Sequence, residues 1–165
     1  MPPVIRSANH GDLPAIVGIY NESGVATTAS YDVEPVTLEE RTAWFERLRN
    51  QGNPVLVLEE DGRVVGFASY GPFRDKAAYR HTVEHSVYVA GGSRSDGAGR
   101  MLLGALIDHA RGRGVHVMIG VLDADNAASR AFHKNLGFVE SAVLPEVGRK
   151  FGRWLDIVFV THRFD

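Results

Sequence analysis

The sequence lacks cysteine altogether. This absence excludes disulfide bonds, thiolate metal sites and a thiol nucleophile. The sequence also has little net charge, formally −2 at pH 7, and no basic run longer than a pair. It therefore offers no electrostatic footprint for nucleic acid or for an anionic membrane, and neither partner is expected. No hydrophobic run approaches the length of a membrane span, and residues 1–13 lack a signal-peptide pattern, so we expect a cytoplasmic protein.

The sequence does contain enough hydrophobic residues for one sizeable core, because they make up 44% of its 165 residues. We expect a single domain over residues 1–165. Asp12 and Pro14 predict the start of a helix that runs to about residue 22, and Thr37–Glu40 forms a capping box for a second helix. Asp61-Gly62 predicts a hairpin between strands 54–59 and 63–72.

Alternating strand and helix patterns continue to the end of the chain. A strand at 4–6 opens it, and later elements are predicted at 81–89, 100–111, 115–122, from Asn126 onward, and at 155–163. This order predicts an α/β (α+β) fold in which helices cover both faces of a mixed sheet.

A glycine-rich turn between the strand at 81–89 and the helix at 100–111 is the most informative feature. Unpaired backbone N–H groups at such a turn, with the helix dipole behind them, suit a phosphate or pyrophosphate. A nucleotide P-loop is excluded, because Ala98 and Gly99 stand where lysine and a hydroxyl residue belong. A dinucleotide fingerprint fits poorly, because Leu102 occupies its third glycine position. Arg94-x-x-Gly97-x-Gly99 is similar to the acyl-CoA pyrophosphate loop of the GCN5-related N-acetyltransferases.

Motifs along nearly the whole chain narrow this resemblance. TASYD (28–32), ASYGPFR (68–74), TVEHSVYV (82–89) and KFGRWLD (150–156) resemble the phosphinothricin and methionine sulfoximine acetyltransferase subfamily. The resemblance implies a mostly antiparallel central sheet, acetyl-CoA as cosubstrate, no metal, and a homodimer with the acceptor site near its interface. The implied reaction is direct acetyl transfer to the α-amine of a small L-amino acid analogue.

Two residues are expected to move protons. Glu84 lies among valines, where a carboxylate is costly to bury unless it is partnered or used, and the resemblance suggests it as the general base. His133 stands where many members of the wider family carry a tyrosine that protonates the leaving thiolate; in the subfamily this position resembles histidine. Tyr88 remains an alternative proton donor.

The resemblance also implies binding residues. Acetyl-CoA is expected to contact Val87, Tyr88, Val89, Arg94, Ser95, Asp96, Gly97, Ala98, Gly99, Arg100 and Asn126. The acceptor is expected to contact Tyr31, Phe73, Arg74, Arg80, Glu84, His85 and Ser86, with Trp154 as a further wall. Arg74 suits a carboxylate, which a guanidinium holds through two parallel hydrogen bonds, and Arg80 could share that role. Asp96 places a negative charge in the pyrophosphate loop, and Asn126 competes with Asp125 as the helix cap.

Other interpretations of the sequence need to be compared with this one. His81-Thr-Val-Glu84-His85 spells the HxxEH pattern of zinc proteases. That motif requires a helix, whereas along a strand the two histidines are separated by roughly 13 Å, so we reject a shared ion. The chain could also be an idle acyl-CoA-binding domain or act on peptide or polyamine amines; retention of both Glu84 and His133 favours the enzyme.

Overall fold

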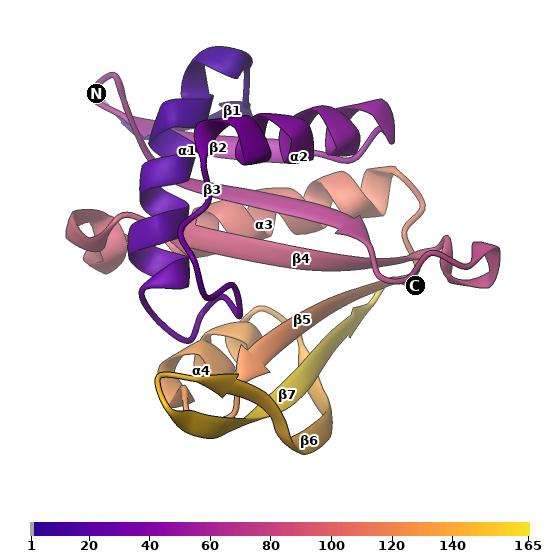
Figure 1. Cartoon of the computed structure of the whole chain (residues 1–165). Helices are drawn as coiled ribbons and strands as arrows, with labels where there is room; N and C mark the ends of the chain where they lie inside the picture. Colours follow the sequence, from indigo (N-terminus) through magenta and orange to yellow (C-terminus); the bar gives the residue numbers. More distant parts are fainter. Residues whose placement is uncertain (1) are drawn as a thin grey trace. The chain divides into compact units, whose positions relative to one another are not determined.

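The computed structural model describes residues 2–165, apart from the side chains of residues 94–96. It has seven strands in the order β1-β2-β3-β4-β5-β7-β6, with four α-helices (Figure 1). The strands are β1 (Val4–Ser7), β2 (Val55–Glu60), β3 (Arg63–Pro72), β4 (Thr82–Val89), β5 (Val117–Asp123), β6 (Val139–Lys150) and β7 (Arg153–Arg163). The helices are α1 (Leu13–Tyr20), α2 (Leu38–Asn50), α3 (Ala98–Gly112) and α4 (Ala127–Asn135), with short helical segments η1 (His10–Asp12), η2 (Asn21–Val25), η3 (Ala77–Tyr79) and η4 (Gly91–Asp96). All pairings described are antiparallel except β4 with β5, so the mixed, mostly antiparallel fold is confirmed.

The chain forms two compact units, residues 1–71 with 86–109 and residues 72–85 with 110–165. In the first unit, α1 and α2 cover one face of β2 and β3, and α3 covers the other (Figure 1). Strand alternation produces this arrangement. Val55 and Val57 pack with α1 and α2, while Gly66 of β3 lies so close to α3 that an added Cβ would be 2.8 Å from Leu102.

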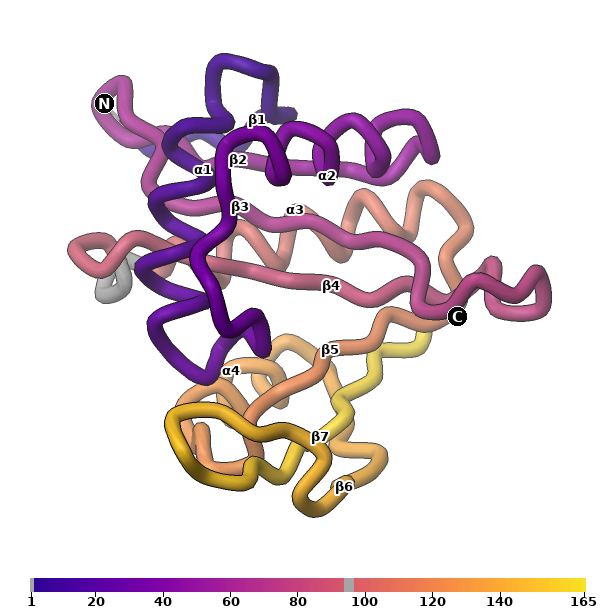
Figure 2. The backbone as a smooth tube through the Cα atoms, in the orientation of Figure 1, coloured from indigo at the N-terminus to yellow at the C-terminus, as the bar shows by residue number. Residues whose placement is uncertain are grey.

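The second unit is built on β5, β7 and β6, with the first half of β4 pairing to β5 in parallel. Figure 2 traces β6 and β7 as a long hairpin. The unit's core includes the buried side chains Met118, Phe138, Leu155, Val158 and Val160. No helix among the described residues is both long and apolar enough to cross a membrane. The single domain expected from the sequence stays a prediction.

Most local signals give the elements that they predict. Thr37 caps α2, because its hydroxyl accepts the Glu40 N–H at 3.1 Å while its own N–H donates to the Glu40 carboxylate at 3.3 Å. The β2–β3 turn places Asp61 and Gly62 at φ 50° and 77°, as a two-residue hairpin of this type requires.

One prediction needs correction, and one strand was not predicted. The Asp12 side chain does not cap α1; its carboxylate instead accepts hydrogen bonds from the Arg6 guanidinium at 2.8 and 2.9 Å and from the Asn9 N–H at 2.8 Å. Strand β6 was not expected at all. Its sequence carries Pro145 and a register shift around Glu146, whose φ is 56°, and such irregular edge strands lack a clean alternating pattern.

Candidate active site

The turn between β4 and α3 lies in the first unit. Gly97 adopts φ 73°, a conformation that favours glycine, and α3 begins at the next residue. The Met101 N–H donates to the Gly97 carbonyl at 3.0 Å, so Ala98, Gly99 and Arg100 form the first turn of α3, where backbone N–H groups have no partner within the helix itself. This backbone can bind an anion. The sequence-based predictions for the side chains of Arg94, Ser95 and Asp96 fall outside the described residues.

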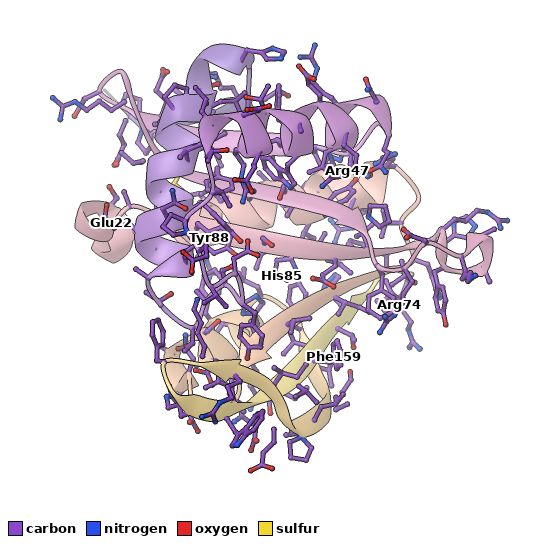
Figure 3. The ribbon with its side chains drawn as sticks, viewed as in Figure 1. Glu22, Arg47, Arg74, His85, Tyr88 and Phe159 are labelled. Atoms are coloured by element: carbon purple, nitrogen blue, oxygen red, sulfur yellow. The ribbon has the colours of Figure 1, made fainter. Side chains whose placement is uncertain are left out.

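The second half of β4 leads into this turn and is held by the first unit. Ser23 Oγ donates to the Val89 carbonyl at 2.8 Å. The Tyr88 ring packs against Tyr20 at 5.1 Å and Phe67 at 5.4 Å between centroids. Figure 3 labels Tyr88 beside α1. Burial raises the pKa of Tyr88, with a smaller contribution from Tyr20. Tyr88 is therefore a weaker proton donor than an ordinary tyrosine.

The neighbouring η2 segment is a π-helix that the sequence gave no sign of. It brings Gly24 against Tyr88, so that a Cβ on Gly24 would be 3.0 Å from the tyrosine ring. π-Helical turns are frequent at functional sites. Ser86, an expected acceptor contact, is hydrogen-bonded to the Tyr88 side chain. The remaining acceptor candidate of this unit, Tyr31, is 38% exposed.

In the second unit, the positive charge of Arg74 acts on the carboxylate of Glu84. Glu84 lies in β4. Arg74, labelled in Figure 3, lies on the segment between β3 and β4. The surrounding protein removes water from the Glu84 carboxylate and raises its pKa, and the positive charge of Arg74 partly offsets this. Glu84 remains exposed enough to be reached from solvent. A carboxylate with a raised pKa accepts a proton from an amine more readily than an ordinary one.

The other residues of this unit that were expected to contact the acceptor substrate interact with residues close to them in the chain. The Arg74 guanidinium lies 4.9 Å from the Phe73 ring centroid, and Phe73 also contacts Tyr79 edge-on. The Arg80 guanidinium donates to the Ala77 carbonyl of its own turn at 3.4 Å. The Arg74 guanidinium is thus placed against an aromatic ring and its charge acts on Glu84, whereas that of Arg80 is hydrogen-bonded within its own backbone segment. Trp154 is 57% exposed and its ring faces Arg149.

His133 and His85 form a pair that the sequence did not reveal. His85 Nε2 lies 2.9 Å from His133 Nε2, and both side chains are buried. The Nδ1 atoms contact backbone carbonyls, that of Ile119 at 3.1 Å for His85 and that of Ser129 at 2.8 Å for His133. Burial lowers the pKa of His85 to about 3, with His133 as a second cause, and also lowers the pKa of His133. Both ring nitrogens of His85 contact protein atoms. Neither nitrogen is therefore left to hydrogen-bond the acceptor substrate, which is the contact that the sequence predicted for His85.

Asn126 caps α4, since its side-chain oxygen accepts the Ser129 N–H at 3.0 Å. This settles its competition with Asp125 for the cap. The expected contact of Asn126 with the pantetheine arm of CoA stays a prediction.

One signal in the sequence did point toward the histidine pair. Gly120 is an isolated glycine in a strand pattern, and such a glycine indicates that another group approaches the backbone closely.

Comparison with known proteins agrees with this geometry. The family model described as "Acetyltransferase (GNAT) family" matches residues 16–138. An L-methionine sulfoximine/L-methionine sulfone acetyltransferase from Pseudomonas aeruginosa is 47% identical, covering 100% of this chain and 96% of the relative.

Two solved structures share the fold. A ribosomal-protein-alanine N-acetyltransferase from Brucella melitensis has a TM-score of 0.95 at 49% identity, covering 98% of this chain and 99% of that one. A phosphinothricin acetyltransferase from Sinorhizobium meliloti in complex with acetyl-CoA has a TM-score of 0.95 at 33% identity, covering 99% and 89%. This chain belongs to the acetyltransferase (GNAT) family of acyltransferase enzymes.

Proposed function

We propose that this enzyme transfers the acetyl group of acetyl-CoA to the α-amine of a small L-amino acid analogue of the methionine sulfoximine, methionine sulfone or phosphinothricin kind. The observation that carries this proposal is the electrostatics of Glu84, a carboxylate whose pKa burial raises and on which the positive charge of Arg74 acts. Such an acceptor carries both an amine to deprotonate and a carboxylate to hold. The Pseudomonas relative, whose name states this substrate class, supports the same proposal.

Acetyl-CoA is assigned to the β4–α3 turn. The N–H groups of Gly97, Ala98, Gly99 and Arg100 suit the pyrophosphate, and the segment Val87–Val89 suits the pantetheine arm. The Sinorhizobium structure, which contains acetyl-CoA and matches 99% of this chain, supports this cosubstrate. Roles for Arg94, Ser95, Asp96 and Asn126 in holding it stay predictions.

Glu84 acts as the general base in this proposal. At neutral pH the acceptor is an ammonium ion and cannot attack a thioester, so Glu84 removes one proton, directly or through water. The free amine then attacks the thioester carbon and the CoA thiolate leaves. His133 supplies the proton that the sulfur takes up, as acid or relay, and Tyr88 is the alternative donor. Arg74 orients the acceptor carboxylate, with Tyr31, Phe73, Arg80 and Ser86 as further acceptor contacts.

A panel of amines tests this function through CoA release in the presence of acetyl-CoA. We expect turnover with methionine sulfone, methionine sulfoximine and phosphinothricin, and none with their N-methylated or amine-free analogues. Mass spectrometry during turnover should find no acetylated enzyme, because attack is direct. Acetyl-CoA binding without turnover on any amine would instead identify an idle CoA-binding domain.

A second candidate acceptor is the N-terminal α-amine of a protein. The Brucella structure, named a ribosomal-protein-alanine N-acetyltransferase, favours it at 49% identity. Short peptides beginning with alanine belong in the same panel, and faster turnover on them than on the amino acid analogues would move the proposal to this class. The cytoplasmic location and the homodimer stay predictions; sedimentation of the purified protein would check the latter.

A further inference from the structure

The connection between η2 and α2, residues 26–37, forms no helix or strand in the part of the chain that the structure describes. Figure 2 shows this connection turning back along α1 before α2 begins. Near its end, the Asn21 side chain donates to the Val36 carbonyl at 3.0 Å and accepts the Val36 N–H at 2.9 Å. Its middle is held by the Tyr20 hydroxyl. Two consecutive residues, Tyr20 and Asn21, thus fix the connection at two points.

The hydrogen bonds at the Tyr20 hydroxyl have one consistent direction. An ionised carboxylate only accepts and a tyrosine hydroxyl carries one hydrogen, so Tyr20 donates to the Asp32 carboxylate. The Ser30 hydroxyl, 2.6 Å from the Tyr20 oxygen, then donates to that oxygen, and the Ser30 oxygen accepts the Asp32 N–H at 3.1 Å. The three residues form a closed ring of hydrogen bonds, in which each bond strengthens the next. Tyr31 stands between the two residues that this ring ties down.

The Tyr20 ring is itself fixed by its neighbours. The Arg41 guanidinium of α2 lies 3.9 Å from the ring centroid, in a cation–π contact. The Tyr88 ring meets Tyr20 edge-on at 5.1 Å between centroids. Tyr20 and Ser30 are buried, whereas Tyr31 is 38% exposed. The hydroxyl therefore reaches the connection from a rigid ring, and the side chain of Tyr31 stays accessible to a ligand.

We propose that Tyr20 is a positioning residue, whose hydroxyl holds the turn from Ser30 to Asp32 and thereby sets where Tyr31 meets the acceptor. This inference rests on the proposed function, in which Tyr31 contacts the amino acid analogue. A side chain on a connection without regular structure contributes to binding only when its backbone is fixed beforehand, because ordering it on binding costs free energy. The Tyr20 hydroxyl takes no part in proton transfer, so it affects the binding of the acceptor and not the chemical step.

Steady-state kinetics of Tyr20→Phe tests this role. The variant keeps the ring that packs with Arg41 and Tyr88 and removes only the hydroxyl. We expect the KM for the amino acid acceptor to rise about tenfold, with kcat and the KM for acetyl-CoA nearly unchanged, because the turn loses hydrogen bonds that include a charged partner. Tyr70→Phe is the matched control and should leave all three parameters unchanged, since Tyr70 is buried in β3 and its hydroxyl contacts His109 Nδ1 at 2.8 Å. An unchanged acceptor KM in folded Tyr20→Phe overturns the proposal.

A double-mutant cycle shows whether the hydroxyl acts through Tyr31. Tyr31→Ala should raise the acceptor KM, and adding Tyr20→Phe to it should raise the KM no further. An equal effect of Tyr20→Phe in both backgrounds overturns the proposal. Ser30→Ala breaks the same ring of hydrogen bonds at a second point and should raise the acceptor KM by a smaller factor, so the test does not depend on the stability of Tyr20→Phe.

Limited proteolysis tests the structural part without requiring activity. Chymotrypsin cleaves after tyrosine, and cleavage after Tyr31 requires the backbone around it to open locally. Mapping by mass spectrometry should show faster cleavage after Tyr31 in Tyr20→Phe than in the wild-type enzyme and in Tyr70→Phe. Equal rates in the three proteins overturn the proposal and leave the proposed function standing. Absence of turnover on the whole amine panel by the wild-type enzyme overturns the proposed function, while the cleavage rates still show whether the hydroxyl holds the turn.

Discussion

Replacing Glu84 by glutamine should abolish the acidic limb of the pH–rate profile and most of the rate. The substitution keeps the size and hydrogen-bonding capacity of the side chain but removes its ability to accept a proton. A positioned general base contributes about a hundredfold or more, which corresponds to about 2.7 kcal/mol of activation barrier. Because Glu84 lies in a strand and remains reachable by solvent, we expect the fold to tolerate the change.

The direction of the Glu84 pKa shift predicts how the activity of the wild-type enzyme depends on pH. Desolvation raises the pKa of this carboxyl, and Arg74 lowers it by a smaller amount. The base must be ionised to act, so kcat/KM should rise with pH through a pKa above the ordinary value for glutamate. Removing the guanidinium in Arg74→Ala should move this limb to still higher pH.

Steady-state CoA release between pH 5 and 9 provides the measurement. Glu60→Gln is the matched control, because Glu60 is also a strand glutamate of this chain but lies at the end of β2. Circular dichroism should show that both variants fold. Wild-type turnover by folded Glu84→Gln, with its acidic limb intact, would refute the assignment of Glu84 as the base.

Further outcomes are expected from three other substitutions. Gly99→Val should weaken acetyl-CoA binding measured by calorimetry, because the added side chain crowds the first turn of α3. Gly104→Val in the same helix is the control. If both variants bind acetyl-CoA with equal affinity, the turn is not part of the cofactor site. Arg74→Ala should raise the KM for the amino acid far more than that for acetyl-CoA, and equal effects on both would assign Arg74 to the fold or the cofactor. Thr37→Ala should lower the free energy of unfolding by about 1 kcal/mol in urea titrations, because α2 loses its cap; no loss would contradict the capping geometry.

Local sequence signals predicted most of the fold because they act over a few residues. The Thr37–Glu40 box, the Asp61-Gly62 turn and the glycine-rich turn before α3 depend on backbone geometry that neighbouring residues set. The same short-range signals predicted that Glu84 lies in a strand. A strand excludes the zinc motif suggested by His81 and His85, because that motif requires a helix. Its valine-rich strand also marked this carboxylate for chemistry. Burial raises its pKa in the structure, and its catalytic role stays a prediction.

Where the signal was ambiguous or absent, the prediction was wrong or missing. Asp12 has the chemistry of a cap, but the Arg6 guanidinium and the Asn9 N–H hold its carboxylate instead. The β6 strand interrupts its pairing with β7 at the register shift near Glu146, so it lacks the period-two pattern that identifies a strand.

The sequence by itself thus determined most of the succession of elements and the glycine-rich turn before α3, and it suggested which residues transfer protons or hold a carboxylate. Only the tertiary structure decided which of these residues meet. His85 and His133 are 48 positions apart, and their contact depends on β4, β5 and α4 packing together with a glycine at position 120. The physical reason is that propensity and capping are set by neighbours along the chain, whereas hydrogen bonding between distant residues, desolvation and charge pairing depend on distances through space that the finished packing sets.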